Sequence, residues 1–356
     1  MCSKKVLDVL KVGFHGNTGD NRSPEDFAFP ACMTSLMQYL GEDYPIMEIE
    51  AHNRKYTLRT GNQHFITASG MAFGLLWHRE YCMSCMDLTQ VNEHNATIKH
   101  AYDWAGYEFE IIEKSKEGNN RGYIKEKIIK SIDKGIPVLA FGIIGPPECL
   151  IINGYDDNGD VVIGWSHFQE WEKCDKELNG MFRKADWYEE LWKIVITGNK
   201  IGRTVTFKDV LSLGLSVMEK TESEGYVAGI AAYDEWIKYV LNVDLDNVDD
   251  ETLKVRHELH HNLVGNLAEA RCFGGDFLFR LSQEMEDENV KGAANCFKDI
   301  HDLCWKAWGV LGEYGQKDAW KGFRNNENRK KIAAVLEEIK SLDQKAIAYL
   351  RLAVKS

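Results

Sequence analysis

The chain has 356 residues, of which 44% are hydrophobic and 28% are charged, a composition that is ordinary for a soluble globular protein. At about 100–200 residues per domain, this length predicts two or three domains. The 55 acidic side chains against 43 basic ones give a net charge of −12, which argues against a protein that binds nucleic acid or an anionic membrane and favours neutral or cationic small ligands.

The first 200 residues predict helices that are followed by strands. Three helical patterns each end at a glycine, and they cover residues 31–40, 89–106 and 124–134. Strand patterns follow at 135–144, 148–165 and 191–198. The second of these contains the turn sequence Asp156–Asp160 and therefore represents two strands. This order predicts an α+β domain with an antiparallel sheet over residues 1–200.

From Phe207 onward the pattern is helical, and no strand is expected. Helices are predicted at 207–221, 226–242, 252–285 and 291–313, and along a last apolar stripe from Ile332 to Leu350. The second domain, residues 201–356, is therefore expected to be an all-helical bundle. Trp305 and Trp308 share one face of their helix, which is typical of a core rather than of a ligand site.

The N-terminal sequence has no apolar core before a small-residue cleavage site, and no run approaches 18 apolar residues. We therefore expect neither a signal peptide nor a membrane-spanning helix. The 9 cysteines are an odd number, and their spacing does not match a small disulfide scaffold. A cytoplasmic protein with mostly free thiols is the resulting expectation.

The segment from Pro30 to Gly41 places Cys32 at the start of a helix, where the helix dipole favours a thiolate. The alternative is a buried cysteine that only packs. The run Cys-x-x-small-Leu-Met-x-x-Leu-Gly resembles the nucleophile helix of papain-like cysteine peptidases. It is closest to their bacteriocin-leader-peptidase branch and to the N-terminal domain of butirosin-type acyltransferases. The later Gly154-Tyr155 pair fits the same superfamily, and the resemblance covers about residues 10–200.

The resemblance implies a papain-like fold with Cys32 as the nucleophile, but three other catalytic positions differ. The position of the family's histidine holds Glu148, and that of its orienting asparagine holds Gly164. The position of its oxyanion-hole glutamine holds Asp26. A glutamate beside Cys32 would disfavour the thiolate, because like charges repel.

Three alternatives follow for this site. In the first, a histidine from elsewhere enters the cleft, with His167 as the first candidate and His15 as the second. In the second, the register slips by one residue and brings Cys149 opposite Cys32 as a dithiol or a disulfide. In the third, the domain keeps the fold without the chemistry. Substrate contacts are expected from two neighbouring side chains, Tyr155 and Trp165.

A second motif is His257-Glu258-Leu259-His260-His261, which matches His-Glu-x-x-His. On a helix, His257 and His261 share a face and could hold Zn²⁺ with Glu258 as the base. A third ligand would have to come from an acidic residue further along, and the candidates are Glu269, Glu284 and Glu286. The alternative is a set of helical histidines without a metal. The lone Cys82-x-x-Cys85 pair is expected to be structural.

Three functions are therefore considered. The first is cysteine-dependent acyl transfer, or amide formation or hydrolysis, with Cys32 as the nucleophile; the resemblance implies a carrier-bound acyl donor and a small-molecule acceptor. The second is a catalytically silent papain-like domain that binds a small ligand or acts as a scaffold. The third is a zinc hydrolase at His257 and His261. No cofactor and no nucleic-acid or membrane partner is expected, and a homodimer is compatible with the large helical domain.

Overall fold

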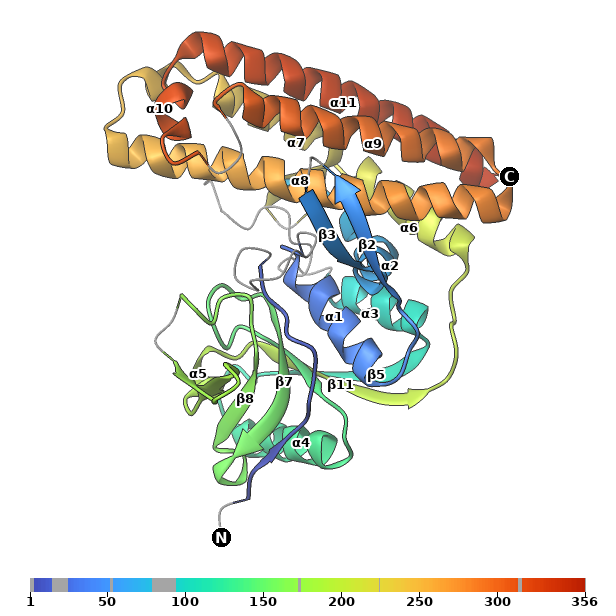
Figure 1. Ribbon diagram of the computed structural model, residues 1–356, viewed down its shortest axis with the longest axis vertical. Helices are drawn as coiled ribbons and strands as arrows, with labels where there is room; N and C mark the ends of the chain where they lie inside the picture. The colour runs from blue at the N-terminus through green and yellow to red at the C-terminus, as the bar shows by residue number, and fades with distance from the viewer. Residues whose placement is uncertain are drawn as a thin grey trace. The chain divides into compact units, whose positions relative to one another are not determined.

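The structure is a computed structural model that describes residues 3–14, 25–51, 54–78, 94–171, 174–223, 225–312 and 316–355 (Figure 1). The chain divides into two compact units. The first, which we call the α/β unit, comprises Met1–Phe65 and His94–Thr204. The second, which we call the helical unit, comprises Ile66–Glu93 and Val205–Ser356. The predicted α+β class, with an antiparallel sheet followed by a helical region, is confirmed.

The α/β unit is built on an eight-stranded antiparallel sheet in the order β5-β11-β6-β7-β8-β10-β9, with β1 paired to β7. Its strands are β1 (Lys5–Val6), β5 (Tyr107–Glu113), β6 (Val138–Phe141), β7 (Cys149–Asp156), β8 (Val161–Trp165), β9 (Asp175–Lys176), β10 (Phe182–Lys184) and β11 (Lys193–Lys200). The side chains of β6 are all buried, as are nearly all of those of β7, which explains their unbroken apolar runs. The strands predicted at 135–144, 148–165 and 191–198 are confirmed.

The connection between β7 and β8 is the predicted turn. Asp157 and Asn158 adopt positive φ angles of 46° and 53°. Asparagine and aspartate tolerate this left-handed region better than other non-glycine residues. The carboxylate of Asp156 accepts a hydrogen bond from the backbone N–H of Asp157 at 2.8 Å, which closes the turn locally.

Five helices belong wholly or in part to the α/β unit: α1 (Ala28–Tyr39), α2 (Thr60–Ala68), α3 (His94–Ala105), α4 (Arg121–Asp133) and α5 (Trp187–Glu190). A hairpin of β2 (Ile46–Ala51) and β3 (Arg54–Arg59), which was not predicted, lies between α1 and α2 in the chain. α1 packs on β7, and α4 packs on β6, β7 and β11. α1 thus covers the strand that begins at Cys149.

The expectation that Cys32 opens its helix is wrong. α1 begins at Ala28, so Cys32 is the fifth helical residue and lies in the second turn. Pro30 is tolerated in the first turn because no backbone N–H is needed there. Since the helix dipole acts within about the first turn, it does not provide the expected activation of the thiol.

The helical unit contains α6 (Phe207–Glu219), α7 (Gly229–Val240), α8 (Asp250–Met285), α9 (Glu288–Gly309), α10 (Ala319–Phe323) and α11 (Asn326–Lys355). α8, α9 and α11 run side by side, and α11 also packs against α6 and α7 (Figure 1). The apolar stripe from Ile332 to Leu350 is the buried face of α11, as predicted. None of the described helices is long and apolar enough to cross a membrane.

The helical unit also contains a small three-stranded sheet, so the prediction of no strand after Phe207 is wrong. Its strands are β4 (Leu76–His78), β12 (Glu222–Ser223) and β13 (Tyr226–Ala228), in the order β12-β13-β4. The helix predicted from residue 226 begins only at Gly229. Residues 226–228 are extended because they pair with a strand from much earlier in the chain.

A buried ion pair links three helices of the helical unit. Arg271 of α8 donates to both carboxylate oxygens of Asp343 of α11, at 3.0 and 2.7 Å. Tyr233 of α7 donates its hydroxyl to the same carboxylate at 2.6 Å. Arg271 also donates to the carbonyl oxygen of Ala72 at 2.5 Å, which ties the early segment of the chain to these helices.

Candidate functional site

The thiol of Cys32 lies against the start of β7. Its Sγ donates to the carbonyl oxygen of Cys149 at 3.7 Å, and Cys32 has no exposed surface. Cys149 is buried as well, and neither cysteine forms a disulfide bond. The structure therefore brings together the two residues that the slipped register predicts, but the contact joins a thiol to a carbonyl oxygen rather than two sulfurs.

His167, the first candidate for the missing base, points elsewhere. Its Nε2 donates to the backbone carbonyl of Glu25 at 2.7 Å, and its ring packs edge-on against Phe14 with the centroids 5.0 Å apart. Burial lowers the pKa of His167 to about 4, so the ring is neutral at pH 7. Within the described residues, the one hydrogen bond of the Cys32 thiol goes to Cys149 and none goes to an imidazole. His15, the second candidate, and the Cys82–Cys85 pair lie outside the described residues.

A buried ion pair lies beside His167. The guanidinium of Arg59 donates to both carboxylate oxygens of Glu25, with a distance of 2.7 Å between Nε and Oε1. Its Nη1 also donates to Ser35 Oγ at 2.7 Å. Asp26, expected at the oxyanion-hole position, follows Glu25 directly. Desolvation and the Glu25 carboxylate raise the pKa of Asp26 to about 6. A carboxyl group with this pKa is partly protonated near neutral pH.

Glu148 and Gly164 occupy the positions of the family's catalytic histidine and orienting asparagine, and neither can take over the role of the residue it replaces. Glu148 is half-buried in the connection just before β7. Gly164 lies in β8 opposite Ile152. A Cβ atom on Gly164 would lie 2.0 Å from the carbonyl oxygen of Ile151, so no side chain fits there. The glycine at the asparagine position is thus required by the close approach of the two strands.

The expected substrate-binding side chains make structural contacts. The indole Nε1 of Trp165 donates to the carbonyl oxygen of Val9 at 3.3 Å, and the Lys11 ammonium lies 5.6 Å from its ring. The hydroxyl of Tyr155 donates to Asp133 Oδ1 at 2.9 Å. Both side chains are buried and join the sheet to neighbouring segments.

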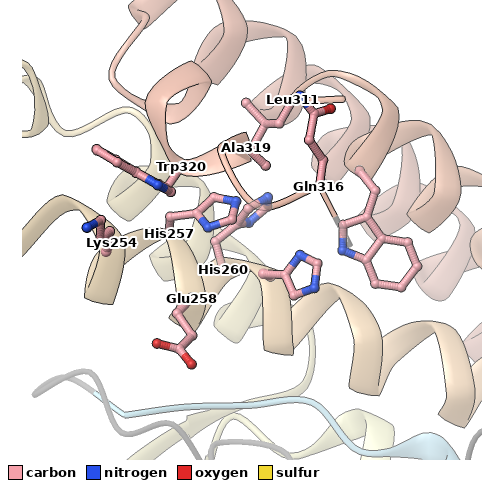
Figure 2. Close-up of a pocket in the computed structure, with 10 residues that line it drawn as sticks. Lys254, His257, Glu258, His260, Leu311, Gln316, Ala319 and Trp320 are labelled. Atoms are coloured by element: carbon pink, nitrogen blue, oxygen red, sulfur yellow. The ribbon is translucent and has the colours of Figure 1, made fainter. Parts of the chain in front are cut away.

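A ligand-sized pocket lies in the helical unit, between α8, α9 and α10 (Figure 2). Its volume is about 280 Å³. It is lined by Lys254, His257, Glu258, His260, His261, Trp308, Leu311, Gln316, Ala319 and Trp320, and we call it the histidine pocket. Three imidazoles and two indoles therefore meet at one site, although the sequence motif singled out only two of these residues as ligands.

The two motif histidines lie one turn apart on α8, with ring centroids 5.7 Å from each other. Burial, and secondarily His261, lower the pKa of His257 to about 4, and burial also lowers the pKa of His261. Glu258 is exposed, and its carboxylate points away from His257 and His260 (Figure 2). Among the described residues, no group of three histidine, cysteine or acidic side chains is placed to hold a metal, so neither Glu269, Glu284 nor Glu286 supplies a third ligand.

His260 lines the histidine pocket as well, and the sequence interpretation gave it no role. Its Nδ1 accepts a hydrogen bond from the indole Nε1 of Trp236 at 3.2 Å, and its ring stacks on Phe323 at an interplanar angle of 12°. Because an indole N–H can only donate, Nδ1 is the acceptor and the neutral ring carries its proton on Nε2. Burial lowers the pKa of His260 to about 3. Nε2 is buried and has no hydrogen-bond partner among the residues that the structure describes.

The two indoles of the histidine pocket differ in their surroundings. Trp308 is 8% exposed and packs on Trp305 with ring centroids 5.0 Å apart, as expected of a core residue. It also lines the pocket, which the expectation of a core rather than a ligand site did not include. Trp320 is half-buried on α10. The ammonium groups of Lys254 and Lys321 lie 4.8 and 5.6 Å from the centre of the Trp320 ring.

No model of a known protein family matches this chain, and no curated protein sequence matches it either. What the protein does has to be inferred from these side chains and their geometry.

Proposed function

We propose that this protein binds a small organic molecule in the histidine pocket, and that its α/β unit is a catalytically silent, papain-like domain. The observation that carries the proposal is the convergence of three imidazoles and two indoles on one pocket, where the buried Nε2–H of His260 has no acceptor among the described residues. A buried donor left unpaired costs about 1–3 kcal/mol, and an acceptor atom of a ligand would offset that penalty. Aromatic walls with a few convergent polar groups are typical of small-molecule sites.

The surroundings of Cys32 support the proposal that it is not a catalytic nucleophile. A catalytic thiol needs an adjacent base or a lowered pKa, and it needs access to the substrate. Cys32 has no exposed surface, and its hydrogen-bond partner is a carbonyl oxygen, which does not take its proton. The described cysteines are thiols outside any disulfide bond, which supports the proposed location in a reducing cytoplasm.

Cysteine-dependent acyl transfer from a carrier-bound donor to a small molecule is the second candidate. It is favoured by one observation: Cys32 on α1 reaches Cys149 at the start of β7, the residue directly after the position of the family's histidine in the papain-like resemblance. This activity would require a movement that exposes the thiol. A zinc hydrolase is less well supported, because His257 and His261 have no third ligand among the described residues.

The binding function is tested with naphthamide, a flat and uncharged probe, by isothermal titration calorimetry on the full chain. We expect saturable one-site binding. Ala319→Trp adds an indole at the pocket wall and should weaken binding at least tenfold. Val255→Trp adds the same group at a position of α8 that is 56% exposed and outside the pocket, and it should leave binding unchanged.

Equal binding by Ala319→Trp and the unmodified chain would place the probe elsewhere and contradict the proposal. If Ala319→Trp fails to fold by circular dichroism, Leu311→Trp fills the pocket from the neighbouring segment and replaces it in the comparison.

A further inference from the structure

The side chains of the histidine pocket restrict the chemistry of its ligand, an inference that rests on the proposed binding function. We infer that the ligand is a planar aromatic anion of one or two rings. Its ring would lie against Trp320 and Trp308, a ring acceptor atom would meet the Nε2–H of His260, and its negative group would lie near Lys254 at the mouth of the pocket.

The size and the walls of the pocket favour a small flat ligand. Its volume of about 280 Å³ is just below the roughly 300 Å³ at which the usual range of small-molecule sites begins. The walls are indole and imidazole rings, whose faces prefer to stack on other flat rings. One or two fused rings therefore fit this pocket better than a branched or flexible chain.

The buried histidine of the lining, His260, offers a donor. His260 is 1% exposed, and the bond from Trp236 leaves its Nε2–H as the group that requires an acceptor. The stacking of its ring on Phe323 holds this N–H in place before any ligand arrives. A ring oxygen, a ring nitrogen or a hydroxyl on the ligand could accept from it.

The mouth of the pocket favours a negative charge. Lys254 is exposed and lies over Trp320, and Lys321 lies over the same ring. With two ammonium groups already at its face, this indole is a poor site for a cationic ligand. Glu258 is the acidic residue of the lining, and its carboxylate points away from the labelled imidazoles into solvent (Figure 2).

The net charge of the chain, −12, favours a cationic ligand, but it acts at longer range. In physiological salt, charges separated by more than about 8 Å are largely screened, so the distributed acidic surface has little effect at the pocket mouth. Lys254 lines the pocket itself, so its ammonium would lie close to the negative group of a bound anion. The ammonium of Lys254 therefore determines the charge preference of the pocket, and we infer an anion in place of the expected neutral or cationic ligand.

The inference is tested with three probes that share one bicyclic ring: naphthoate, naphthamide and naphthylmethylammonium. Calorimetry on the full chain at neutral pH should give the tightest binding for naphthoate, at least tenfold tighter than for the ammonium probe. Lys254→Gln should weaken naphthoate binding about threefold to tenfold and change naphthamide binding less than twofold. Lys298→Gln, a matched control at an exposed lysine of α9 outside the lining, should change naphthoate binding less than twofold.

The outcomes separate the two proposals. If naphthamide binds but the ammonium probe matches or exceeds naphthoate, the anion inference is overturned while the binding function stands. The same holds if Lys254→Gln binds naphthoate as tightly as the unmodified chain. If none of the three probes binds, the binding function itself is overturned.

Discussion

The indole Nε1 of Trp236 donates to Nδ1 of His260 across 3.2 Å, and α7 thereby fixes the proton of this imidazole on the side chain's other nitrogen. Phe323 holds the same ring by stacking at a centroid distance of 5.4 Å. Both restraints come from residues outside the pocket lining. The Nε2–H of His260 is therefore held in place by the fold and does not depend on a ligand.

Removing this restraint should be measurable. Trp236→Phe keeps most of the aromatic packing and leaves the buried Nδ1 of His260 without its donor, so the free energy of unfolding should fall by about 1–3 kcal/mol. Nitrogen-detected NMR should show a protonated Nε2 in the unmodified chain and a mixture of tautomers in the variant. Trp171→Phe, at a tryptophan that is 68% exposed, should change stability by less than about 0.5 kcal/mol. An unchanged tautomer in Trp236→Phe would contradict this assignment.

The stability of the protein should decrease as the pH falls below about 6.5. Burial lowers the pKa of His167 to about 4 and that of His260 to about 3, whereas both titrate near 6.5 in the unfolded chain. Between these values the unfolded chain binds more protons, so stability is complete above about pH 6.5 and is lost toward the folded-state pKa. Each histidine should contribute a loss of about 2 kcal/mol by about pH 5. Urea unfolding across this range measures it, and His260→Asn should flatten the dependence.

Asp26 should act in the opposite direction. Desolvation, and then Glu25, raise its pKa from 3.8 to about 6, so the folded chain holds this proton more tightly than the unfolded one. Its contribution is complete below about pH 4 and is lost as the pH rises through about 6. Asp26→Asn should therefore raise stability at neutral pH and steepen the decline toward pH 5 in urea unfolding. A less stable variant at neutral pH would show that the ionised carboxylate is needed.

Much of the fold could be predicted because its elements have local signatures. The apolar run that became β6, the turn at Asp156–Asp160 and the stripe of α11 each follow from neighbouring residues alone. β13 could not be predicted in this way, because it is only three residues long and runs directly into the helical pattern of α7, and it is extended through its pairing with β4. The β2–β3 hairpin was missed although Met47, Ile49 and Ala51 alternate with acidic residues, a period of two that indicates a strand.

The candidate site was less accessible to sequence reasoning. The meeting of Cys32 and Cys149 follows from a helix that packs on the strand after it, but the complete burial of the thiol depends on tertiary packing. His260 occupies a variable position of the His-Glu-x-x-His motif, so the motif gives it no role. Its function depends on Trp236 and Phe323, which come from other helices.

The reactivity of Cys32 distinguishes a silent thiol from a nucleophile. In the native protein, we expect a small electrophilic thiol reagent to leave Cys32 unmodified, because its sulfur is buried and bonded to a carbonyl oxygen. Cys174 is half-buried and should react much faster, which provides an internal control. Peptide mapping by mass spectrometry locates the label. Rapid native labelling at Cys32 that Cys32→Ala abolishes would favour the acyl-transfer candidate instead.

The resemblance to papain-like enzymes suggests an attempt to restore their asparagine at residue 164, and the structure indicates that this should fail. In Gly164→Asn, the new Cβ would lie 2.0 Å from the carbonyl oxygen of Ile151, so β7 and β8 would have to separate. Overpacking of this kind costs about 1–3 kcal/mol or more. Thermal unfolding should show the loss. Gly122→Asn, at a glycine of α4 with open space around it, is the control and should be nearly neutral.

The carboxylate of Asp343 should be the most sensitive single group in the helical unit. It is 2% exposed and accepts from Arg271 and Tyr233, so it joins α11 to α8 and α7. Asp343→Ala leaves the guanidinium of Arg271 buried without its partner, a change that typically costs about 3–5 kcal/mol. Glu338 is also on α11, and its carboxylate forms an exposed ion pair with Lys306 of α9. Glu338→Ala removes this pair and should cost about 0–1 kcal/mol. Urea unfolding compares the two variants, and similar losses would mean that apolar packing rather than the ion pair holds α11 in place.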